Sequence, residues 1–306
     1  MSQEKRILFL YCEEPVHAGK GTSTGTIDLP IQRESHTNLP KFEGSGLRGA
    51  IREAIGDNIG HDDNDFNRIF GNRHNGEKHS AVDFTDASIL FFPVRSAKGI
   101  IAWLTCPFVL NRFARDVNKM FGQTLEIKNL SSIDGGIIIT QKCSNIELDK
   151  KVVLEEFLFT AIEKDVQIDG KGIGTWILEM LGNITDNEIT NMLKTNIGIV
   201  EDEVFRDFTE LFTPKITRNS IDPNTGIANE TGLFNEEFLP PETILYAFAT
   251  ADDEFKEKED ERLTAKNNIK FIDDDLPTLF KAGGDKGIGK GLLRRSLYPI
   301  NTAKTE

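Results

Sequence analysis

Apolar residues along the chain form short blocks whose spacing predicts strands. The first block, residues 6–12, is an almost continuous apolar run with the length of one buried strand. Two further blocks, residues 87–94 and 99–105, flank a Ser-Ala-Lys turn, as in a hairpin. The remaining predicted strands lie at 127–141, 197–200, 216–221 and 244–249.

Other segments have helical features. A helix is predicted from Ser45, because apolar residues recur there every three or four positions on one face. Pro107 suits the first turn of a second helix, and residues 154–162 are predicted to form a third. Thr185, followed three residues later by Glu188, has the pattern of a capping box at the start of a fourth.

The order of these elements indicates the fold class. Strands and helices alternate irregularly, with hairpin-like insertions, which favours an α+β fold over a doubly wound parallel sheet. The polar stretch 57–80 is expected to be an irregular insertion, and its function stays open, as does that of segment 123–171.

A long segment without hydrophobic periodicity, residues 13–44, follows the first predicted strand. It carries Gly19, Gly21, Gly25, Pro30 and Pro40. Long irregular connections inside compact domains are usually binding or catalytic loops. Loop 13–44 is therefore the first candidate functional segment.

The distribution of charged residues along the chain bears on nucleic-acid binding. The net charge is −13, from 36 Lys and Arg against 49 Asp and Glu, which argues against nucleic-acid binding if it is averaged over the surface. Much of the acid is clustered in 201–203, 252–261 and 273–275, which is typical of solvated faces. Basic residues gather in one N-terminal stretch: Lys20, Arg33, Lys41, Arg48 and Arg52. A local basic groove is compatible with an acidic exterior.

Composition also bears on the compartment. The apolar runs are far shorter than a bilayer crossing, so no membrane segment is expected. Cys12, Cys106 and Cys143 lie far apart beside apolar stretches, as reduced core thiols do in a cytoplasmic protein. A zinc site or a disulfide is not expected.

Three sequence blocks carry a resemblance to a known family: HAGKG at 17–21, IDLPIQRE at 27–34 and GSGLRGAIR at 44–52. Together they resemble the N-terminal signature of the RAMP family, in the version typical of backbone subunits of type III-B (Cmr) CRISPR complexes. Shorter matches continue in order to the Gly-rich stretch 283–291. Because the resemblance spans nearly the whole chain, it implies a single RAMP domain over residues 1–306.

That resemblance implies a modified RRM-like (ferredoxin-like) palm with inserted helical regions, and a protruding β-hairpin thumb at residues 216–237. It implies copies of the chain stacked head to tail along a CRISPR guide RNA, with complementary target RNA and other Cmr subunits as partners. It also implies cleavage of the target at regular intervals in antiviral defence. Asp28 matches the essential catalytic aspartate of the family, and Glu236 matches another site residue. Phe238 stands where Tyr is common, so that position offers no hydroxyl.

The start of the helix predicted at Ser45 has the features of an anion site. Glycines on both sides of Ser45 leave the backbone amides accessible, and the helix dipole favours a phosphate there. Ser45, Arg48 and Arg52 are therefore predicted guide-RNA contacts. The alternative is an ordinary helix capped by Ser45, with two solvated arginines.

The Gly-rich segment 283–291 has the spacing of a phosphate-binding P-loop up to Lys290. The next residue should be Ser or Thr to hold magnesium, but it is Gly291. An NTPase is therefore disfavoured. Lys286 and Lys290 are instead predicted to contact RNA backbone, and a surface turn without a ligand is the alternative.

Asp28 is the main candidate for the chemistry. In-line RNA cleavage needs a group that assists deprotonation of the attacking oxygen, and positive charge that stabilises the developing anion. Asp28 could supply this assistance directly or as a transient ligand of Mg²⁺ or Mn²⁺, and a turn-stabilising role is the alternative. His17 and Glu236 are further catalytic candidates, although an isolated His is often structural. Arg218, in strand 216–221, is a candidate phosphate contact, with a surface charge as its alternative.

Residues 222–226, DPNTG, are a strong turn signal between strand-like flanks. As a thumb, this hairpin would insert between bases of the guide–target duplex and expose a phosphodiester, whereas a plain surface hairpin is the alternative. Two function classes stay open: a scaffold that is also an endoribonuclease, and a scaffold that binds guide RNA without cutting.

Overall fold

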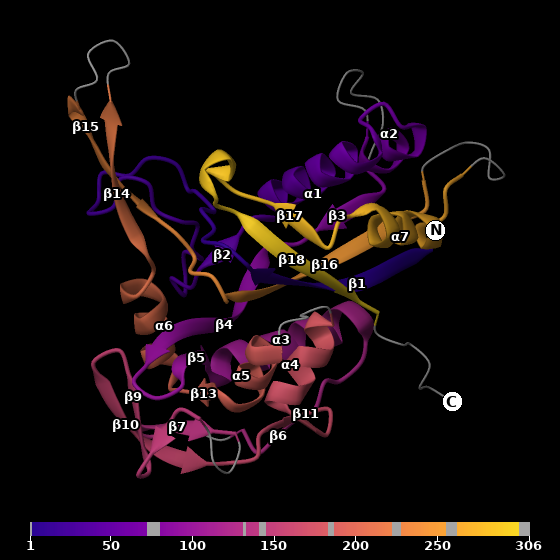
Figure 1. The fold of residues 1–306 in the computed structure, drawn as a ribbon. Helices are drawn as coiled ribbons and strands as arrows, with labels where there is room; N and C mark the ends of the chain where they lie inside the picture. The colour runs from indigo at the N-terminus through magenta and orange to yellow at the C-terminus, as the bar shows by residue number, and fades with distance from the viewer. Residues whose placement is uncertain are drawn as a thin grey trace.

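Strand β1 (Gln3–Cys12) lies between β16 (Ile244–Asp252) and β18 (Leu292–Tyr298) and pairs antiparallel with both. The computed structural model describes residues 2–71, 80–130, 133–140, 145–182, 187–221, 228–254 and 262–299. Apolar side chains fill the buried part of β1, residues 7–12, where helices cover the sheet on both faces (Figure 1). The buried strand predicted at 6–12 is confirmed.

The helices are α1 (Gly44–Ile59), α2 (Asn64–Phe70), α3 (Pro107–Phe121), α4 (Ile173–Leu181), α5 (Asn187–Thr195), α6 (Asp202–Leu211), α7 (Ala265–Asp275) and the short 3-10 helix η2 (Lys286–Ile288). The other strands are β2 (Lys41–Phe42), β3 (Val82–Phe84), β4 (Ala87–Ser96), β5 (Ile100–Thr105), β6 (Ile127–Lys128), β7 (Gly136–Ile139), β8 (Glu147–Leu148), β9 (Lys151–Leu154), β10 (Phe157–Glu163), β11 (Gln167–Ile168), β12 (Lys171–Gly172), β13 (Ile197–Ile199), β14 (Lys215–Ile221), β15 (Ala228–Glu237) and β17 (Leu279–Lys281).

The largest sheet is mixed and runs in the order β17-β18-β1-β16-β4-β5-β13-β7-β10-β9-β8. Parallel pairing occurs at β5–β13 and at β7–β10, whereas β1, β16, β4 and β18 pair antiparallel. Helices α1 and α7 lie on one side of the central strands, and α3 and α4 lie on the other (Figure 1). The predicted α+β class is therefore confirmed.

An aromatic cluster holds the α3–α4 side to the sheet. The ring of Phe113 in α3 lies 4.8 Å from that of Tyr246 in β16 and 5.5 Å from that of Trp176 in α4, edge to face in both cases. Such pairs contribute about 0.5–1.5 kcal/mol each beyond the area that they bury. The central strands are thus a rigid base for the segments that emerge from them.

Strands β14 and β15 form a separate two-stranded hairpin that projects from the body (Figure 1). The two strands of the hairpin predicted at 216–237 are present and pair with each other. The turn predicted at 222–226 lies outside the described residues. The hairpin base is tied to loop 13–44 by bridges Val16–Leu239 and Leu29–Glu236.

Two expectations on secondary structure are wrong. Residues 154–162 are not a helix: β9 and β10 pair there as a hairpin, around a turn in which Glu155 has φ 50°. Residues 57–80 are not wholly irregular, because α1 continues to Ile59 and α2 follows with Asp63 as its N-cap. Thr185 of the expected capping box lies outside the described residues.

Candidate active site

Loop 13–44 is fastened along its length by backbone hydrogen bonds. The amide of Lys20 donates to the carbonyl of Pro30, and that of Gln32 donates to the carbonyl of Ala18, so the loop folds back on itself. The amide of Leu29 donates to the carbonyl of Asn235 at 3.0 Å. The loop thus forms an extra layer against the base of the β14–β15 hairpin.

Asp28 lies where this loop meets β15. Its Oδ2 accepts a hydrogen bond of 2.8 Å from the backbone N–H of Asn235, and its own carbonyl accepts one from Ser23. The side chain is half-buried, so it is held in place while remaining partly accessible. A carboxylate in this setting has lone pairs left for a proton, a cation or an RNA hydroxyl.

His17 is buried in the same region. Its Nδ1 lies 2.8 Å from the carbonyl oxygen of Glu237. Because a carbonyl only accepts, Nδ1 carries the hydrogen. Nε2 then faces Glu236, whose Oε1 lies 3.5 Å away. The structure therefore brings together His17 and Glu236, two of the residues proposed from the sequence.

Glu236 also contacts Arg218, which bridges two carboxylates. Arg218 Nη1 lies 3.2 Å from Glu236 Oε2, and Nη2 lies 2.7 Å from Asp285 Oδ2. Burial raises the pKa of Glu236, and the nearby Asp285 carboxyl raises it further, against the charges of His17 and Arg218. Burial alone would raise the pKa of Asp285, but hydrogen bonds with Arg218 and Glu236 hold it below its ordinary range. A proton shared by the two carboxyls therefore belongs to Glu236.

Phe238 forms the apolar floor of this cluster. Its fully buried ring has the His17 ring 5.6 Å away, the Arg218 guanidinium 5.7 Å away and the Lys290 ammonium 5.5 Å away. Cations over an aromatic face are attracted by its quadrupole. Lys290 of the Gly-rich segment and Arg218 of the hairpin thus meet at one ring.

A groove of about 490 Å³ opens beside His17. It separates α1 from the Gly-rich segment, and glycines line both of its sides: Gly19, Gly46, Gly49, Gly283 and Gly284. A Cβ on Gly283 would lie 2.4 Å from the carbonyl oxygen of His17, so only glycine fits there. Lys286 also lines the groove. The walls therefore expose backbone at close range to a positive side chain.

The N-terminus of α1 differs from expectation. Glu43, not Ser45, is the N-cap, and Ser45 is the second helical residue, exposed to solvent. The amide of Gly44 donates to Asp86 Oδ1 at 2.8 Å, so a carboxylate already occupies this part of the helix start. Lys41 Nζ lies 2.8 Å from the other oxygen of Asp86, and this hydrogen bond raises the pKa of Lys41.

The structure spreads the remaining basic candidates apart. Arg48 donates to the carbonyl of Phe70 at 2.7 Å, and Arg52 lies over the ring of Phe66, so both fasten α1 to α2. Arg33 is turned inward, with Nη2 2.7 Å from the buried Glu237 carboxylate. Lys20 is exposed. Contacts of these four residues with RNA stay predictions.

Two acidic residues of the cluster, Asp285 and Glu237, were not among the candidates proposed from the sequence. Asp285 lies within the Gly-rich segment and has φ 61°, a conformation that Asp adopts more readily than most residues. Glu237 directly follows Glu236. Side chains alternate along a strand, so neighbouring glutamates point to opposite faces, and each meets a different part of loop 13–44: Glu236 lies beside His17, and Glu237 lies beside Ile31 and Arg33.

The donors available for a divalent cation are few. Within the described residues, no three His, Cys, Asp or Glu side chains are grouped so as to hold a metal ion. Mg²⁺ usually keeps several waters and binds through one or two carboxylates and substrate phosphates. Asp28 supplies a single, partly accessible carboxylate, which is one of the ligand types that Mg²⁺ accepts.

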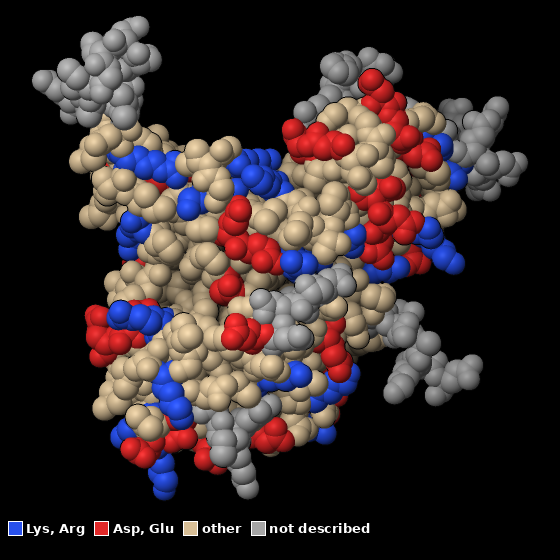
Figure 2. Space-filling model, viewed as in Figure 1, with Lys and Arg blue, Asp and Glu red and all other residues tan. Residues whose placement is uncertain are grey.

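Charge is unevenly distributed over the surface. In Figure 2, Lys and Arg side chains gather over the β14–β15 hairpin and the nearby Gly-rich segment, whereas Asp and Glu cluster over the α2 end. The net charge of −13 thus conceals a basic area beside the candidate site. None of the described helices is long and apolar enough to span a bilayer.

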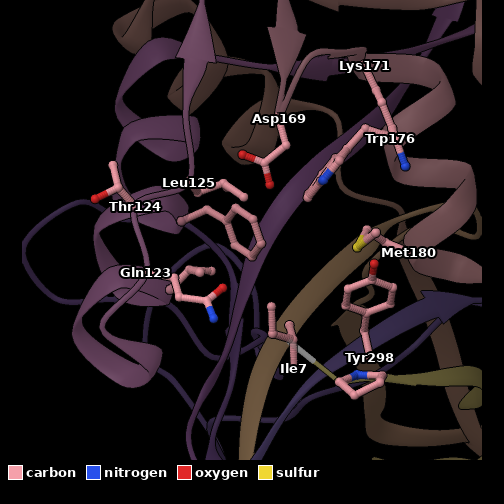
Figure 3. A pocket seen from close by; sticks show the side chains of 12 residues that line it. Ile7, Gln123, Thr124, Leu125, Asp169, Lys171, Trp176, Met180 and Tyr298 are labelled. Carbon is pink, nitrogen blue, oxygen red and sulfur yellow. The ribbon is translucent and has the colours of Figure 1, made fainter. Parts of the chain in front are cut away.

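A second pocket, of about 190 Å³, lies between β1, α3 and α4 (Figure 3). Trp176, Met180 and Tyr298 form its apolar part, with Asp169 and Lys171 at its edge. None of the candidate catalytic or RNA-binding residues lines it. The second pocket is thus separate from the region around His17, Asp28 and Glu236.

Known proteins resemble this chain along most of its length. The family model of the RAMP superfamily matches residues 9–294. The chain is 34% identical over 297 residues to "CRISPR system Cmr endoribonuclease Cmr4" of Pyrococcus furiosus, covering 95% of each protein. It is 23% identical over 255 residues to "CRISPR system CMR subunit Cmr4" of Saccharolobus solfataricus, covering 78% of this chain and 82% of the relative.

Solved structures agree with these sequence matches. The crystal structure of oligomeric Cmr4 from Pyrococcus furiosus has a TM-score of 0.67 at 30% identity, covering 98% of this chain and 99% of its own. A cryo-EM structure of the type III-B Cmr-beta bound to cognate target RNA contains a chain with a TM-score of 0.72 at 19% identity, covering 96% of both chains. The latter supports the fold alone.

Proposed function

This chain belongs to the RAMP superfamily, and from that membership we propose that it is the backbone subunit of a type III-B (Cmr) CRISPR complex. In this role it binds guide RNA in several copies and cleaves complementary target RNA at regular intervals, as part of antiviral defence in the cytoplasm. The observation that carries the proposal is the 34% identity, over 95% of both chains, to a protein named as a Cmr endoribonuclease.

We further infer how the architecture serves RNA binding. The antiparallel strands β1, β16, β4 and β18 with their helices correspond to a modified RRM-like palm, and the β14–β15 hairpin corresponds to the thumb. Guide RNA would follow the glycine-lined groove, where exposed backbone allows close approach of phosphates. Sequence would then be read by base pairing with the guide, and the protein would recognise backbone shape.

The basic side chains around the groove fit this path. Lys286 lines the groove, and Lys290 and Arg218 lie over the Phe238 ring beside His17. Ser45 and Lys41 lie at the α1 start, and Lys20 extends from loop 13–44 into solvent. Arg33, Arg48 and Arg52 hold neighbouring segments together in the free chain. Their contact with RNA would require side-chain rearrangement.

Asp28 is the residue that we expect to be essential for cleavage. Its carboxylate would assist deprotonation of the attacking oxygen or hold a hydrated Mg²⁺ or Mn²⁺ ion at the phosphate. Such a cation would supply positive charge for the developing anion. His17 presents Nε2 beside Glu236, an arrangement suited to moving a proton between them and the reacting group. Arg218 would neutralise charge at the same place.

The proposal is tested with Asp28→Asn in a complex reconstituted with guide RNA and magnesium or manganese. The variant keeps the size of the side chain but loses its negative charge. Assembly and target binding should persist, and the regularly spaced cleavage products should disappear together. Asp149→Asn is a matched control, since Asp149 lies on an exposed turn with φ 49°, which Asn also tolerates. Undiminished cleavage by Asp28→Asn would leave a non-catalytic guide-RNA-binding scaffold as the function.

A further inference from the structure

Glu237, which was not proposed from the sequence, connects several parts of the candidate site. It is the last residue of β15, and its side chain is 2% exposed. Oε1 accepts hydrogen bonds from Arg33 Nη2 at 2.7 Å and Thr213 Oγ1 at 2.6 Å. Oε2 accepts one from the backbone N–H of Ile31 at 3.0 Å. One carboxylate thus fastens loop 13–44 to the segment that precedes the thumb.

The backbone of Glu237 holds two of the three catalytic candidates, Asp28 and His17. Its N–H donates to the carbonyl of Leu29, the residue after Asp28, at 3.0 Å. Its carbonyl accepts from Nδ1 of His17 at 2.8 Å. The first contact sets the position of the Asp28 segment, and the second fixes the ring orientation and tautomer of His17. A shift of Glu237 would therefore displace Asp28 and His17 together.

The charge of Glu237 suits this role. Burial would raise the pKa of its carboxyl, but the Arg33 guanidinium and the three hydrogen bonds outweigh burial and hold the pKa below its ordinary value. The group is thus an ionised acceptor for all three donors. Buried charges of this kind are costly to leave unpaired, and so the arrangement of donors around them is strongly specified.

We propose that Glu237 is a positioning residue for target cleavage: its buried carboxylate holds residues 29–33, and through them Asp28 and His17, in the geometry that the reaction requires, without contacting RNA. The inference rests on the proposed function. A displacement of about 1 Å in a reacting group costs on the order of 100-fold in rate. The site therefore depends on the buried carboxylate that holds it.

The test is Glu237→Gln in the reconstituted complex, measured in single turnover. Gln keeps the shape but has only one acceptor oxygen, so its NH2 group must face either Arg33 and Thr213 or the backbone N–H of Ile31, all of which need an acceptor. The cleavage rate at saturating target should fall about 10- to 100-fold, while the target concentration for half-saturation stays within about twofold, because no RNA contact is removed. A loss confined to target affinity would overturn the proposal.

Glu254→Gln is the matched control. It also breaks a buried pair, since Arg68 Nη2 lies 2.5 Å from Glu254 Oε2, but this pair lies between α2 and the end of β16. Its rate per folded complex should equal that of the wild type. If Glu237→Gln fails to assemble, Thr213→Val serves instead, because it removes one donor and keeps the charge pair. That variant should lower the saturated rate several-fold, and an unchanged rate would refute the inference.

Asp28→Asn separates this inference from the proposed function. If Asp28→Asn cleaves normally, the nuclease assignment itself fails. If Asp28→Asn is inactive while folded Glu237→Gln cleaves at the wild-type rate, only the positioning role of Glu237 fails.

Discussion

The Asp28 carboxylate and the backbone N–H of Asn235 are joined by a hydrogen bond of 2.8 Å. This contact ties the candidate catalytic loop to strand β15 at a point two residues before Glu237. A loop and a hairpin that share such a bond are held in a defined relation, so a motion of the β14–β15 hairpin would be transmitted to Asp28 directly.

Asp28→Ala should therefore have a structural effect that Asp28→Asn lacks, because Asn retains an oxygen that accepts from Asn235. Removal of the acceptor should lower the free energy of unfolding by about 1–3 kcal/mol and speed hydrogen exchange at the Asn235 amide. Both variants should lose cleavage. Hydrogen exchange followed by mass spectrometry or NMR would decide, and equal protection of this amide in both variants would contradict the hydrogen bond.

Neutralising Lys286 and Lys290 should weaken RNA binding without regard to base sequence. Both lysines belong to the Gly-rich segment beside the groove, and phosphate contacts carry no base information. For single-stranded RNA, loss of two contacts should reduce the slope of log affinity against log salt by about 1.4. The control is Lys128→Gln with Lys151→Gln, two exposed lysines on other strands. An unchanged slope in the Lys286 and Lys290 double variant would exclude these lysines from the RNA path.

Arg48 and Arg52 carry a different expectation, because the structure gives them intramolecular partners. Arg48→Gln with Arg52→Gln removes the contacts to Phe70 and Phe66, so the free energy of unfolding should fall by about 1–2 kcal/mol. If they also contact guide RNA, affinity should fall together with its salt slope. Urea unfolding and filter binding separate the two effects. A stability loss with unchanged RNA affinity would assign these arginines to the α1–α2 contact alone.

The sequence predicted the segments whose hydrophobic pattern is decisive. Buried strands such as β1 and β4 are continuous apolar runs, and Pro107 marks the start of α3. Residues 154–162 were misread because a short apolar run fits a strand and a helix equally well. Helix α6 was missed because its first residues, Asp202 and Glu203, belong to an acidic cluster that was read only as a solvated face.

The candidate site was predicted residue by residue, but its internal connections were not. Motif resemblance identified Asp28, His17 and Glu236, whereas the inward orientation of Arg33 depends on a partner 204 positions away in the chain. Likewise, a helix was predicted to begin at Ser45, whereas α1 begins at Gly44, whose amide pairs with Asp86 from the connection between β3 and β4. Long-range pairings of this kind are set by tertiary packing, which local pattern does not encode.

Glu242 provides a test of burial that is independent of RNA. It follows the two prolines after the thumb, and burial raises the pKa of its carboxyl to about 7 from the ordinary 4.5. In the part of the chain that the structure describes, its buried Oε2 has no hydrogen-bond partner. The backbone is nevertheless well held, since its carbonyl accepts from Trp103 Nε1 at 2.9 Å. When it is ionised, the Glu242 carboxylate is therefore a charge in a buried environment that favours its neutral form.

Glu242→Gln should therefore stabilise the fold in a pH-dependent way. The pKa of Glu242 is higher in the folded than in the unfolded protein. Protonation of Glu242 therefore stabilises the wild type fully below about pH 4.5, and this contribution is lost as pH rises toward about 7. The urea midpoint of the variant should exceed that of the wild type by a margin that grows over this range and is constant above it. Glu156→Gln, on an exposed turn, controls for the removal of one negative charge. A margin that is equal at about pH 5 and about pH 8 would show that Glu242 is not destabilised by burial.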